Sequence, residues 1–394
     1  MKWNNKGKEI TDAAAHIVEE FKKRKGIYIF GAGILGEEMR LILEEYKIFL
    51  KYIDNDLEKQ KVGHKSAEVI SIENYLLDGN KGWVVVAASE KNTKIISEQL
   101  EEKGLKERID FFCYQDFLSD VFPIISLYCY DKLFAEISQI CLTERCTLKC
   151  RKCAHACHRV PKDRADMPLE IVKESADIFF KRFDMVKEFT LIGGEPFLYK
   201  DLKSSIEYIG ENYRKKMMIF SITTNGTILP DDEILDLCKR YDISIRISDY
   251  SESLPSLKKQ YDKVYKKVAQ NKVIVWKTDH EKSWLDYGFG EIDRGTDENQ
   301  LMEAFDKCRT PCREIRGYKY YYCVMARSVS ENLGIDAGKQ DYLDLRKTEN
   351  RQEILEFQMG YSDKGYLDMC RFCRGAEAKG YLIPAAEQEE KRLE

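Results

Sequence analysis

The sequence Cys146-Thr-Leu-Lys-Cys150-Arg-Lys-Cys153 directly follows a short apolar run that ends at Leu142. Three cysteines separated by three and then two residues can turn their thiolates toward one centre only if the backbone between them forms a loop. Thiolates are the ligands that zinc, copper(I) and iron–sulfur clusters prefer. Three ligands instead of four leave one metal position open for another molecule.

Two simpler interpretations of this loop stay open. The following stretch, Ala-His-Ala-Cys157-His158, offers two more ligands and would complete a zinc knuckle. Alternatively, the thiols are buried core residues. The chain has 13 cysteines, and a reducing compartment favours metal or redox roles over disulfides for so many.

Composition limits the class of protein. A chain of 394 residues that is 43% hydrophobic has enough apolar material for two or three packed domains. The 64 basic and 68 acidic residues give a net charge of −4, which favours neither nucleic acid nor an anionic membrane as a partner. The charged stretch Met1–Glu20 lacks a signal-peptide core, and the longest apolar run, Val121–Tyr130, is too short to span a bilayer. We therefore expect a cytoplasmic protein.

The first 120 residues contain a nucleotide-binding pattern. The β-rich run Gly26–Phe30 leads into Gly31-Ala-Gly33-Ile-Leu-Gly36, which opens a helical pattern, and a second apolar segment ends at Asp54. In a dinucleotide fold, such glycines let a pyrophosphate approach the helix N-terminus, and the acidic residue binds a ribose. The ligand would be NAD or a nucleotide-sugar. The alternative is that the glycines only close the turn between strand and helix.

Two more strands are expected in this region, at Trp83–Ala88 and Ile109–Cys113. We predict a Rossmann-like parallel-sheet α/β domain over residues 1–120. It resembles the small α/β domains at one end of sugar-modifying transferases and capsule-biosynthesis proteins.

From residue 134 onward, short β-runs alternate regularly with amphipathic helices. The expected strands are at residues 136–142, 186–192, 217–222, 243–247 and 273–276. Polar residues at the ends of parallel strands are typical of TIM-type barrels. About six units fit before Gly290, so we predict a partial (β/α)6 barrel over residues 134–292 that is open on one side.

Three of these strands end in turns that could bind a ligand. Gly193-Gly194-Glu195-Pro196 combines glycines, which permit close backbone approach, with a carboxylate or carbonyl that can bind an ammonium group. The next strand ends in Thr223-Thr-Asn225-Gly, and the one after it delivers Ser248.

The C-terminal region carries a second group of cysteines. Arg313–Tyr322 is a predicted β-hairpin with Gly317 at its turn, followed by Cys323. Five thiols for four ligand positions would complete either an iron–sulfur centre or a zinc ribbon, namely Cys308, Cys312, Cys323, Cys370 and Cys373. We predict a small cluster-binding hairpin and helix module over residues 300–380. The other cysteines are expected in the core, namely Cys113, Cys129, Cys141 and Cys238, and residues 385–394 as a solvated tail.

Taken in order, these motifs resemble those of the radical S-adenosylmethionine (radical SAM) enzymes over about residues 134–375. The resemblance implies a [4Fe–4S] cluster on Cys146, Cys150 and Cys153. It also implies a second, auxiliary cluster in a C-terminal module of the SPASM or shorter twitch type. Cys308 fits the module's spacing better than Cys312 does. One departure is Lys152, where the family usually has an aromatic residue near the adenine.

The resemblance also implies roles for the polar turns. The turn at residues 193–196 would bind the amino group of SAM, Thr223 and Asn225 its ribose or carboxylate, and Ser248 would help to hold the same cofactor. An electron from a flavodoxin or ferredoxin would split SAM into methionine and a 5′-deoxyadenosyl radical, which removes a hydrogen atom from the substrate. The auxiliary cluster would accept an electron in an oxidation, return one in an epimerisation, or only support the fold.

The substrate class is predicted from the accompanying domain. Peptide-modifying members usually carry a winged-helix domain at the N-terminus, and here an α/β domain stands in that place. We therefore expect a sugar or nucleotide-linked sugar first, and a ribosomally made peptide second. A different class remains open, namely an NAD-dependent oxidoreductase centred on Gly31, Gly33 and Gly36 with structural zinc sites.

Overall fold

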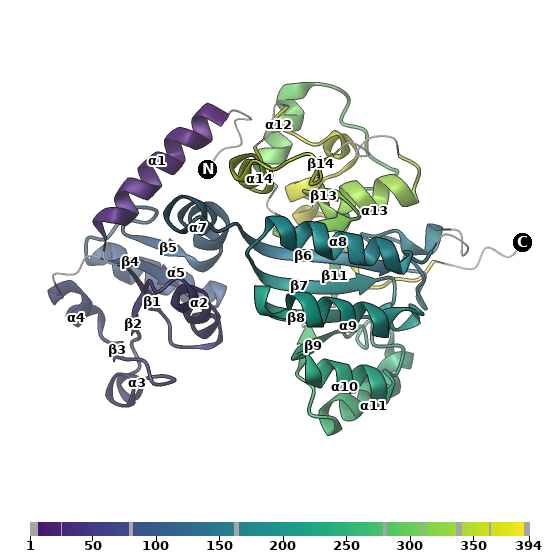
Figure 1. The fold of residues 1–394 in the computed structure, drawn as a ribbon, viewed down its shortest axis with the longest axis horizontal. Coiled ribbons are helices and arrows are strands. Elements are labelled where there is room, and N and C mark those ends of the chain that lie inside the picture. The colour runs from purple at the N-terminus through teal and green to yellow at the C-terminus, as the bar shows by residue number, and fades with distance from the viewer. Residues whose placement is uncertain are drawn as a thin grey trace, which may run out of the picture. The chain divides into compact units, whose positions relative to one another are not determined.

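The computed structural model describes residues 7–24, 26–78, 82–160, 165–278, 282–308, 310–335, 341–361 and 364–389. The chain divides into two compact units (Figure 1), one of Lys8–Leu133 and one that begins at Phe134. Among the helices of the described residues, none combines the length and the apolar character that crossing a bilayer needs.

The N-terminal unit is built on a five-stranded parallel sheet with the strand order β3-β2-β1-β4-β5. The strands are β1 (Ile27–Phe30), β2 (Phe49–Ile53), β3 (Val69–Ile70), β4 (Trp83–Val86) and β5 (Phe111–Cys113). The helices are α1 (Gly7–Lys23), α2 (Ile34–Glu45), α3 (Leu57–Val62), α4 (Ile72–Leu77), α5 (Glu90–Glu102), α6 (Tyr114–Asp116) and α7 (Phe122–Tyr130). The two-residue strand β3 was missed from sequence because so short a run carries no periodicity.

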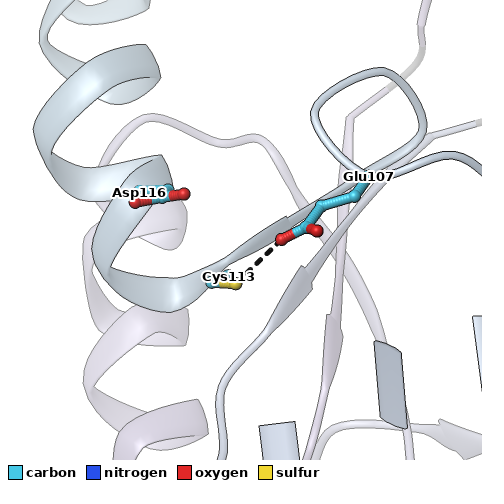
Figure 2. Close-up of side chains that lie close together, drawn as sticks. All are labelled: Glu107, Cys113 and Asp116. Atoms are coloured by element: carbon cyan, nitrogen blue, oxygen red, sulfur yellow. Dashed lines mark hydrogen bonds between the residues drawn. The ribbon is translucent and has the colours of Figure 1, made fainter. Parts of the chain in front are cut away.

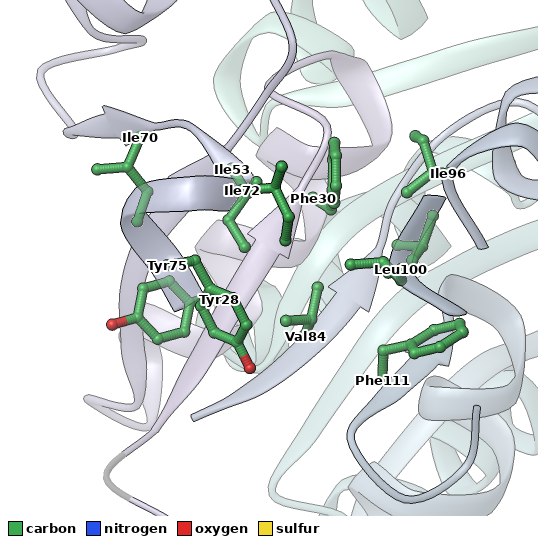
Figure 3. Close-up of a cluster of buried hydrophobic side chains, with 11 residues drawn as sticks. Tyr28, Phe30, Ile53, Ile70, Ile72, Tyr75, Val84, Ile96, Leu100 and Phe111 are labelled. Carbon is green, nitrogen blue, oxygen red and sulfur yellow. The ribbon is translucent and has the colours of Figure 1, made fainter. Parts of the chain in front are cut away.

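One hydrophobic cluster of this unit joins the central strands to helix α5. Tyr28, Phe30 and Val84 of the central strands pack with Ile96 and Leu100 of α5 (Figure 3). Trp83 and Val84 are buried with the rest of β4, as expected of a strand covered on both faces.

The turn between β1 and α2 depends on two glycines. Gly31 has φ = +112°, which an L-residue with a side chain rarely adopts. A Cβ on Gly36 would lie 1.9 Å from the Gly31 carbonyl oxygen, whereas a Cβ on Gly33 would meet nothing within 4 Å. Two of the three glycines are therefore required by the fold itself.

The second unit contains an eight-stranded sheet with the order β10-β9-β8-β7-β6-β12-β13-β14. Six adjacent strands are parallel and the last two pair antiparallel. The strands are β6 (Phe134–Thr143), β7 (Met185–Gly193), β8 (Met217–Thr224), β9 (Ile243–Ser248), β10 (Val275–Thr278), β12 (Cys312–Arg316), β13 (Lys319–Tyr321) and β14 (Tyr342–Asp344).

The expectation of about six strand–helix units before Gly290 needs correction. Within the described residues, five parallel strands lie there, and the sixth parallel strand is β12 of the C-terminal region, which pairs with β6. The predicted hairpin is formed by β12 and β13 with Gly317 at its turn. A strand's partner so distant in sequence leaves no local signal, so the sequence could not assign β12 to this sheet.

Helices α8 (Leu169–Arg182) and α9 (Leu202–Tyr213) lie over strands β6, β7 and β8 (Figure 1). The next two, α10 (Asp232–Arg240) and α11 (Lys258–Gln270), follow β8 and β9, and α10 begins at an Asp231 side chain that accepts a bond from the Ile234 amide. The C-terminal region adds α12 (Glu298–Asp306), α13 (Val324–Asn332) and α14 (Arg351–Gln358), with the two-stranded sheet of β11 (Ser283–Leu285) and β15 (Leu382–Pro384).

A buried ion triad joins α13 to the central sheet. Arg327 is fully buried and pairs with Glu144, which follows β6, and with Glu314 of β12. Although burial opposes ionisation, the Arg327 charge lowers the pKa of Glu144 to about 2, whereas burial raises the pKa of Glu314. Removing the cation would leave two carboxylates without compensation in the interior.

We expect Arg327→Met to destabilise the second unit by about 3–5 kcal/mol, the cost of breaking a buried pair from one side. Arg346→Met is the matched control, because Arg346 is half exposed beside Asp344 and such pairs contribute at most about 1 kcal/mol. Amide hydrogen exchange of α13 and β12 in the full-length protein measures both losses. Equal losses would contradict the role given to the triad.

In the N-terminal unit, Gly36→Ala should cost about 1–3 kcal/mol because the new methyl group overlaps the Gly31 carbonyl. Gly33→Ala should cost less than about 1 kcal/mol, since its position is open and only helix capping changes. Hydrogen exchange of β1 and β4 compares the two variants. A larger loss in Gly33→Ala would show that the turn is built differently.

Candidate functional site

The carboxyl ends of β6 to β9 surround a cavity of about 550 Å³. It is lined by most of the residues predicted from sequence, namely Cys146, Cys150, Cys153, Gly193, Gly194, Thr223, Asn225 and Ser248. Parallel strands bring the loops that follow them to one edge of a sheet, so the motifs meet although about a hundred residues separate the first from the last.

The glycines of residues 193–196 are needed by the cysteine loop. The Gly194 amide donates to the Thr143 carbonyl (2.8 Å), and the Glu195 amide to the Arg145 carbonyl (2.8 Å). A Cβ on Gly194 would lie 2.5 Å from the Arg145 carbonyl oxygen and 2.7 Å from Cys146 Cβ. Gly194 was predicted to let the backbone approach a ligand closely. In the structure, it lets the backbone approach the segment that carries the first cysteine.

The predicted ligand role of the Glu195 carboxylate needs correction. Glu195 is fully buried and lies outside the cavity lining, as does Pro196. Its carboxylate accepts hydrogen bonds from the Thr224 hydroxyl (2.8 Å to each oxygen), the Asn225 amide (2.9 Å) and the Phe197 amide (3.1 Å). Burial raises its pKa to about 7. Glu195 thus connects two loops of the site through hydrogen bonds. Of the two predicted acceptors for an ammonium group, carboxylate and backbone carbonyl, only the carbonyls of this turn are left.

Asn225 contacts the cysteine loop directly. Its Nδ2 donates to Cys146 Sγ (3.4 Å) and to the Thr147 hydroxyl (3.2 Å). The hydroxyl groups of Thr223 and Thr190 are 3.2 Å apart. The turn after β8 therefore supports the sulfur of a predicted metal ligand as well as lining the cavity.

The spacing of the cysteine sulfurs distinguishes between metals. In the described part of the chain, only Glu107, Cys113 and Asp116 bring three candidate ligand atoms within 4.8 Å of one another. Two sulfurs on one zinc, at about 2.3 Å each, cannot be more than ~4.6 Å apart. The seven predicted ligand cysteines are all described, so neither group converges on a single zinc ion. An iron–sulfur cluster binds its cysteines through different irons, so it does not require the sulfurs to meet at one point.

The protonation of the loop thiols is uneven. A hydrogen bond from Cys157 lowers the pKa of Cys153 to about 6, whereas burial raises that of Cys146 to about 11 and that of Cys150 to about 12. Cys157 thus acts as a donor to a predicted ligand. Metal binding to this loop would release protons from the other two thiols.

A second cavity, of about 520 Å³, holds the other cysteines. Cys308, Cys323, Cys370 and Cys373 all line it, whereas Cys312 lines the first cavity. Burial raises the pKa of Cys308 and of Cys373 to about 12. Leu285 and Tyr287 line both cavities, which are therefore neighbours.

The prediction of a solvated C-terminal tail is wrong for residues 385–389, and residues 390–394 lie outside the described residues. Ala385 and Ala386 are fully buried. The Glu389 amide donates to the Lys149 carbonyl (2.8 Å), and the Arg151 amide donates to the Glu387 carbonyl (2.8 Å). Residues 382–389, which we call the C-terminal strap, therefore continue from β15 onto the cysteine loop. The alternating charges predicted a solvent-exposed segment. The prediction failed because backbone hydrogen bonds hold the strap, and these leave no mark in the side-chain pattern.

One strap side chain reaches a predicted cluster ligand. Gln388 accepts from the Lys149 amide (2.8 Å) and donates from Nε2 to Cys150 Sγ (3.4 Å). His158, a zinc candidate from sequence, instead pairs with Glu389 (3.0 Å). Nothing in the sequence around Gln388 indicates a site.

Lys152, which lies between the second and third cysteines of the loop, makes ion pairs. Its Nζ lies 3.3 Å from Asp286 Oδ2 and also contacts Glu291. Asp286 pairs in turn with Arg374 (3.1 Å), next to Cys373. The lysine therefore connects the cysteine loop to the region of the second cavity.

Two charged residues of the first cavity were missed from sequence, Glu188 of β7 and Arg246 of β9. Glu188 follows Lys187 on β7, and Arg246 is the charged residue of β9. Arg246 Nη2 donates to Glu188 Oε2 (2.7 Å). The signal was present, because a charge inside a buried strand needs a partner or a ligand.

In the N-terminal unit, Asp54 is already bonded. Its carboxylate accepts from the Ala32 amide (2.8 Å), the Asp56 amide (3.0 Å) and Lys59 Nζ (3.0 Å). These contacts brace the glycine turn, which favours the structural interpretation of Gly31, Gly33 and Gly36 over ribose binding by Asp54.

The close group of Glu107, Cys113 and Asp116 in this unit (Figure 2) makes contacts within itself and with Arg108. The Cys113 thiol donates to Glu107 (3.3 Å), and burial raises its pKa to about 11. Asp116 pairs with Arg108 (2.8 Å). Of the four cysteines expected in the core, Cys141 and Cys238 are buried, and Cys113 and Cys129 are half-buried.

Comparison with solved structures finds similar chains of low identity. BtrN in complex with AdoMet and 2-DOIA has 16% identity and a TM-score of 0.38, covering 63% of this chain and 98% of BtrN. Streptococcus suis SuiB bound to its precursor peptide SuiA has 16% identity and a TM-score of 0.31, covering 48% and 46%. AnSMEcpe with bound AdoMet has 14% identity and a TM-score of 0.33, covering 60% and 88%.

No curated protein matches the chain. The model of the Radical SAM superfamily matches residues 140–274, from β6 to the segment before β10. This range contains the three loop cysteines and the turns after β7, β8 and β9 that line the first cavity with them. Residues 140–274 therefore form a radical SAM superfamily domain.

Proposed function

We propose that this protein is a radical SAM enzyme with two [4Fe–4S] clusters, which removes a hydrogen atom from a sugar or nucleotide-linked sugar for oxidation or epimerisation. SAM and the first cluster supply the chemistry when bound, because one-electron cleavage of SAM yields methionine and a 5′-deoxyadenosyl radical. Cys146, Cys150 and Cys153 hold the first cluster, and Cys308, Cys323, Cys370 and Cys373 the auxiliary one.

The observation that carries this proposal is the grouping of the cysteines. Three cysteines of a loop line one cavity together with the turns at Gly193, Thr223 and Ser248, and four others line the neighbouring cavity. Neither group converges closely enough for one zinc ion. The placement of Cys312 in the first cavity favours Cys308 as the fourth auxiliary ligand.

The residues around the first cavity have distinct roles in this proposal. The backbone at residues 193–195 and the side chains of Thr223, Asn225 and Ser248 bind and orient SAM, while Glu195 holds two of these turns in register. A flavodoxin or ferredoxin supplies the electron. The auxiliary cluster, fully ligated by four thiolates, exchanges electrons instead of binding substrate.

The N-terminal unit and the cell compartment belong to the proposal as well. The parallel strand order β3-β2-β1-β4-β5 supports a Rossmann-like domain, which in a cytoplasmic enzyme of this kind would accompany sugar chemistry. The occupied Asp54 carboxylate disfavours the alternative of an NAD-dependent oxidoreductase.

Iron and sulfide content of protein purified without oxygen tests the two clusters. We expect about eight irons per chain, falling to about four when Cys146, Cys150 and Cys153 are all replaced by Ala. Cys308→Ser should also leave about four, whereas Cys312→Ser should keep about eight. Zinc in place of iron would contradict the proposed radical reaction. An equal loss of iron in both serine variants would contradict the assignment of Cys308 as the ligand.

The Gln388 amide should raise the reduction potential of the first cluster, because a hydrogen bond to a ligating sulfur stabilises the more negative, reduced state. Gln388→Glu keeps the oxygen that accepts from Lys149 but loses the donor to Cys150, so its midpoint potential should be more negative than wild type. An electron paramagnetic resonance titration measures it, with Gln352→Leu on α14 as the control. An unchanged potential at full iron content would contradict this role.

A further inference from the structure

The first cavity extends deeper than the predicted SAM residues. Arg246 precedes Ser248 by two residues on β9, which places it about 7 Å further from the strand's carboxyl end. Glu188 lies five residues before Gly193 on β7, and both charged residues line the cavity. The inner part of the wall is therefore polar and separate from the turns assigned to SAM.

Arg246 is held in place by a buried carboxylate. Its Nη2 donates to Glu188 Oε2 (2.7 Å), and the Ser221 hydroxyl donates to the other oxygen of Glu188 (2.8 Å). The Glu188 side chain is 4% exposed and that of Arg246 is 34% exposed. Arg246 Nε is buried and has no hydrogen-bond partner among the described residues. The guanidinium group is thus oriented in advance, and the exposed third of the side chain is the part that a ligand can reach.

The charge of this pair selects the kind of ligand. Glu188 neutralises Arg246, so the wall offers hydrogen-bond donors without a net positive charge. A phosphate or carboxylate is best bound by an uncompensated cation, whereas hydroxyl groups can accept from Arg246 and donate to Glu188 or Thr190. Neutral hydroxyl groups therefore fit this wall better than anionic groups do.

An aromatic pair forms another part of the lining. Trp284 of β11 and Tyr250 contact each other edge to face, with ring centroids 5.5 Å apart. Trp284 is placed by the C-terminal strap, because it pairs with Ile383 of β15. An aromatic face beside hydrogen-bonding groups suits the C–H face of a sugar ring.

Size restricts the ligand further. The cavity of about 550 Å³ must hold SAM as well, and cavities of this size hold one drug-sized ligand. Because SAM and the first cluster share this space with the substrate, a compact substrate fits better than a nucleotide-linked one. We propose that Arg246, Glu188 and Trp284 form the substrate site and that the substrate is a small, neutral, polyhydroxylated ring compound. This inference rests on the proposed function and narrows its substrate class.

The test uses the full-length, cluster-loaded protein with SAM, kept without oxygen. Saturation-transfer NMR and calorimetry measure binding of D-glucose and myo-inositol as neutral probes, and of D-glucose 6-phosphate and UDP-glucose as anionic ones. We expect both neutral probes to bind at least tenfold more tightly than either anionic probe. Arg246→Met should weaken their binding at least tenfold, the cost of about one buried hydrogen bond, and leave SAM binding unchanged. Arg346→Met should change neither.

Glu188→Gln tests the charge argument separately. It leaves Arg246 uncompensated, so the preference should shift at least tenfold toward D-glucose 6-phosphate. Arg246→Lys keeps the charge but loses the planar fork. Comparing the thermal unfolding and iron content of Arg246→Met with those of Arg246→Lys and wild type shows whether a loss in Arg246→Met reflects misfolding.

The outcomes separate the two proposals. Wild-type protein that cleaves SAM but binds no neutral probe, or prefers the anionic ones, overturns the substrate site and leaves the radical SAM function standing. Undiminished binding in Arg246→Met overturns it as well. Wild-type protein that has no iron and binds no SAM overturns the proposed function itself.

Discussion

The cysteine loop depends on one buried cation. Arg327 of α13 is fully buried between Glu144, two residues before Cys146, and Glu314 of β12. From the same helix, Asn332 donates to the His155 carbonyl (2.6 Å) and Ser328 to the Ala154 carbonyl (3.2 Å). Both ends of the loop are thus attached to a helix that lies about 180 residues further along the chain. Because the pair is buried, its geometry is fixed more strictly than that of a surface ion pair.

The same helix connects the two cavities. Cys323, which lines the second cavity, stands at the N-cap of α13, and Arg327 follows one turn later. The C-terminal strap provides a second connection, since β15 pairs with β11 and Gln388 then reaches Cys150. Lys152 adds a third through Asp286 and Arg374. The C-terminal region therefore supports the cysteine loop from several sides, apart from any role of its own cysteines.

The sheet of the second unit explains how a polar site can exist inside it. Strands β6 to β9 bury both faces, yet Glu188 of β7 and Arg246 of β9 are charged, and these two neutralise each other. A lone charge at either position would be costly, whereas a pair with Ser221 as an additional donor is tolerated. The polar wall thus follows from pairing the two buried charges with each other, although Arg246 Nε has no partner among the described residues.

The sequence by itself determined the local elements and the motifs. Alternating apolar runs located strands β6 to β9 to within a few residues. The cysteine spacings, with the turns at residues 193–196, 223–226 and 248, indicated the radical SAM domain. These features are local, because each is encoded within one strand and the loop that follows it. Only the tertiary structure decided that β12 joins the sheet beside β6, that Cys312 faces the first cavity, that the Glu195 carboxylate is internal, and that the strap covers the cysteine loop. Each of these depends on which distant segments meet, and pairing between distant segments leaves no periodic signal in the chain.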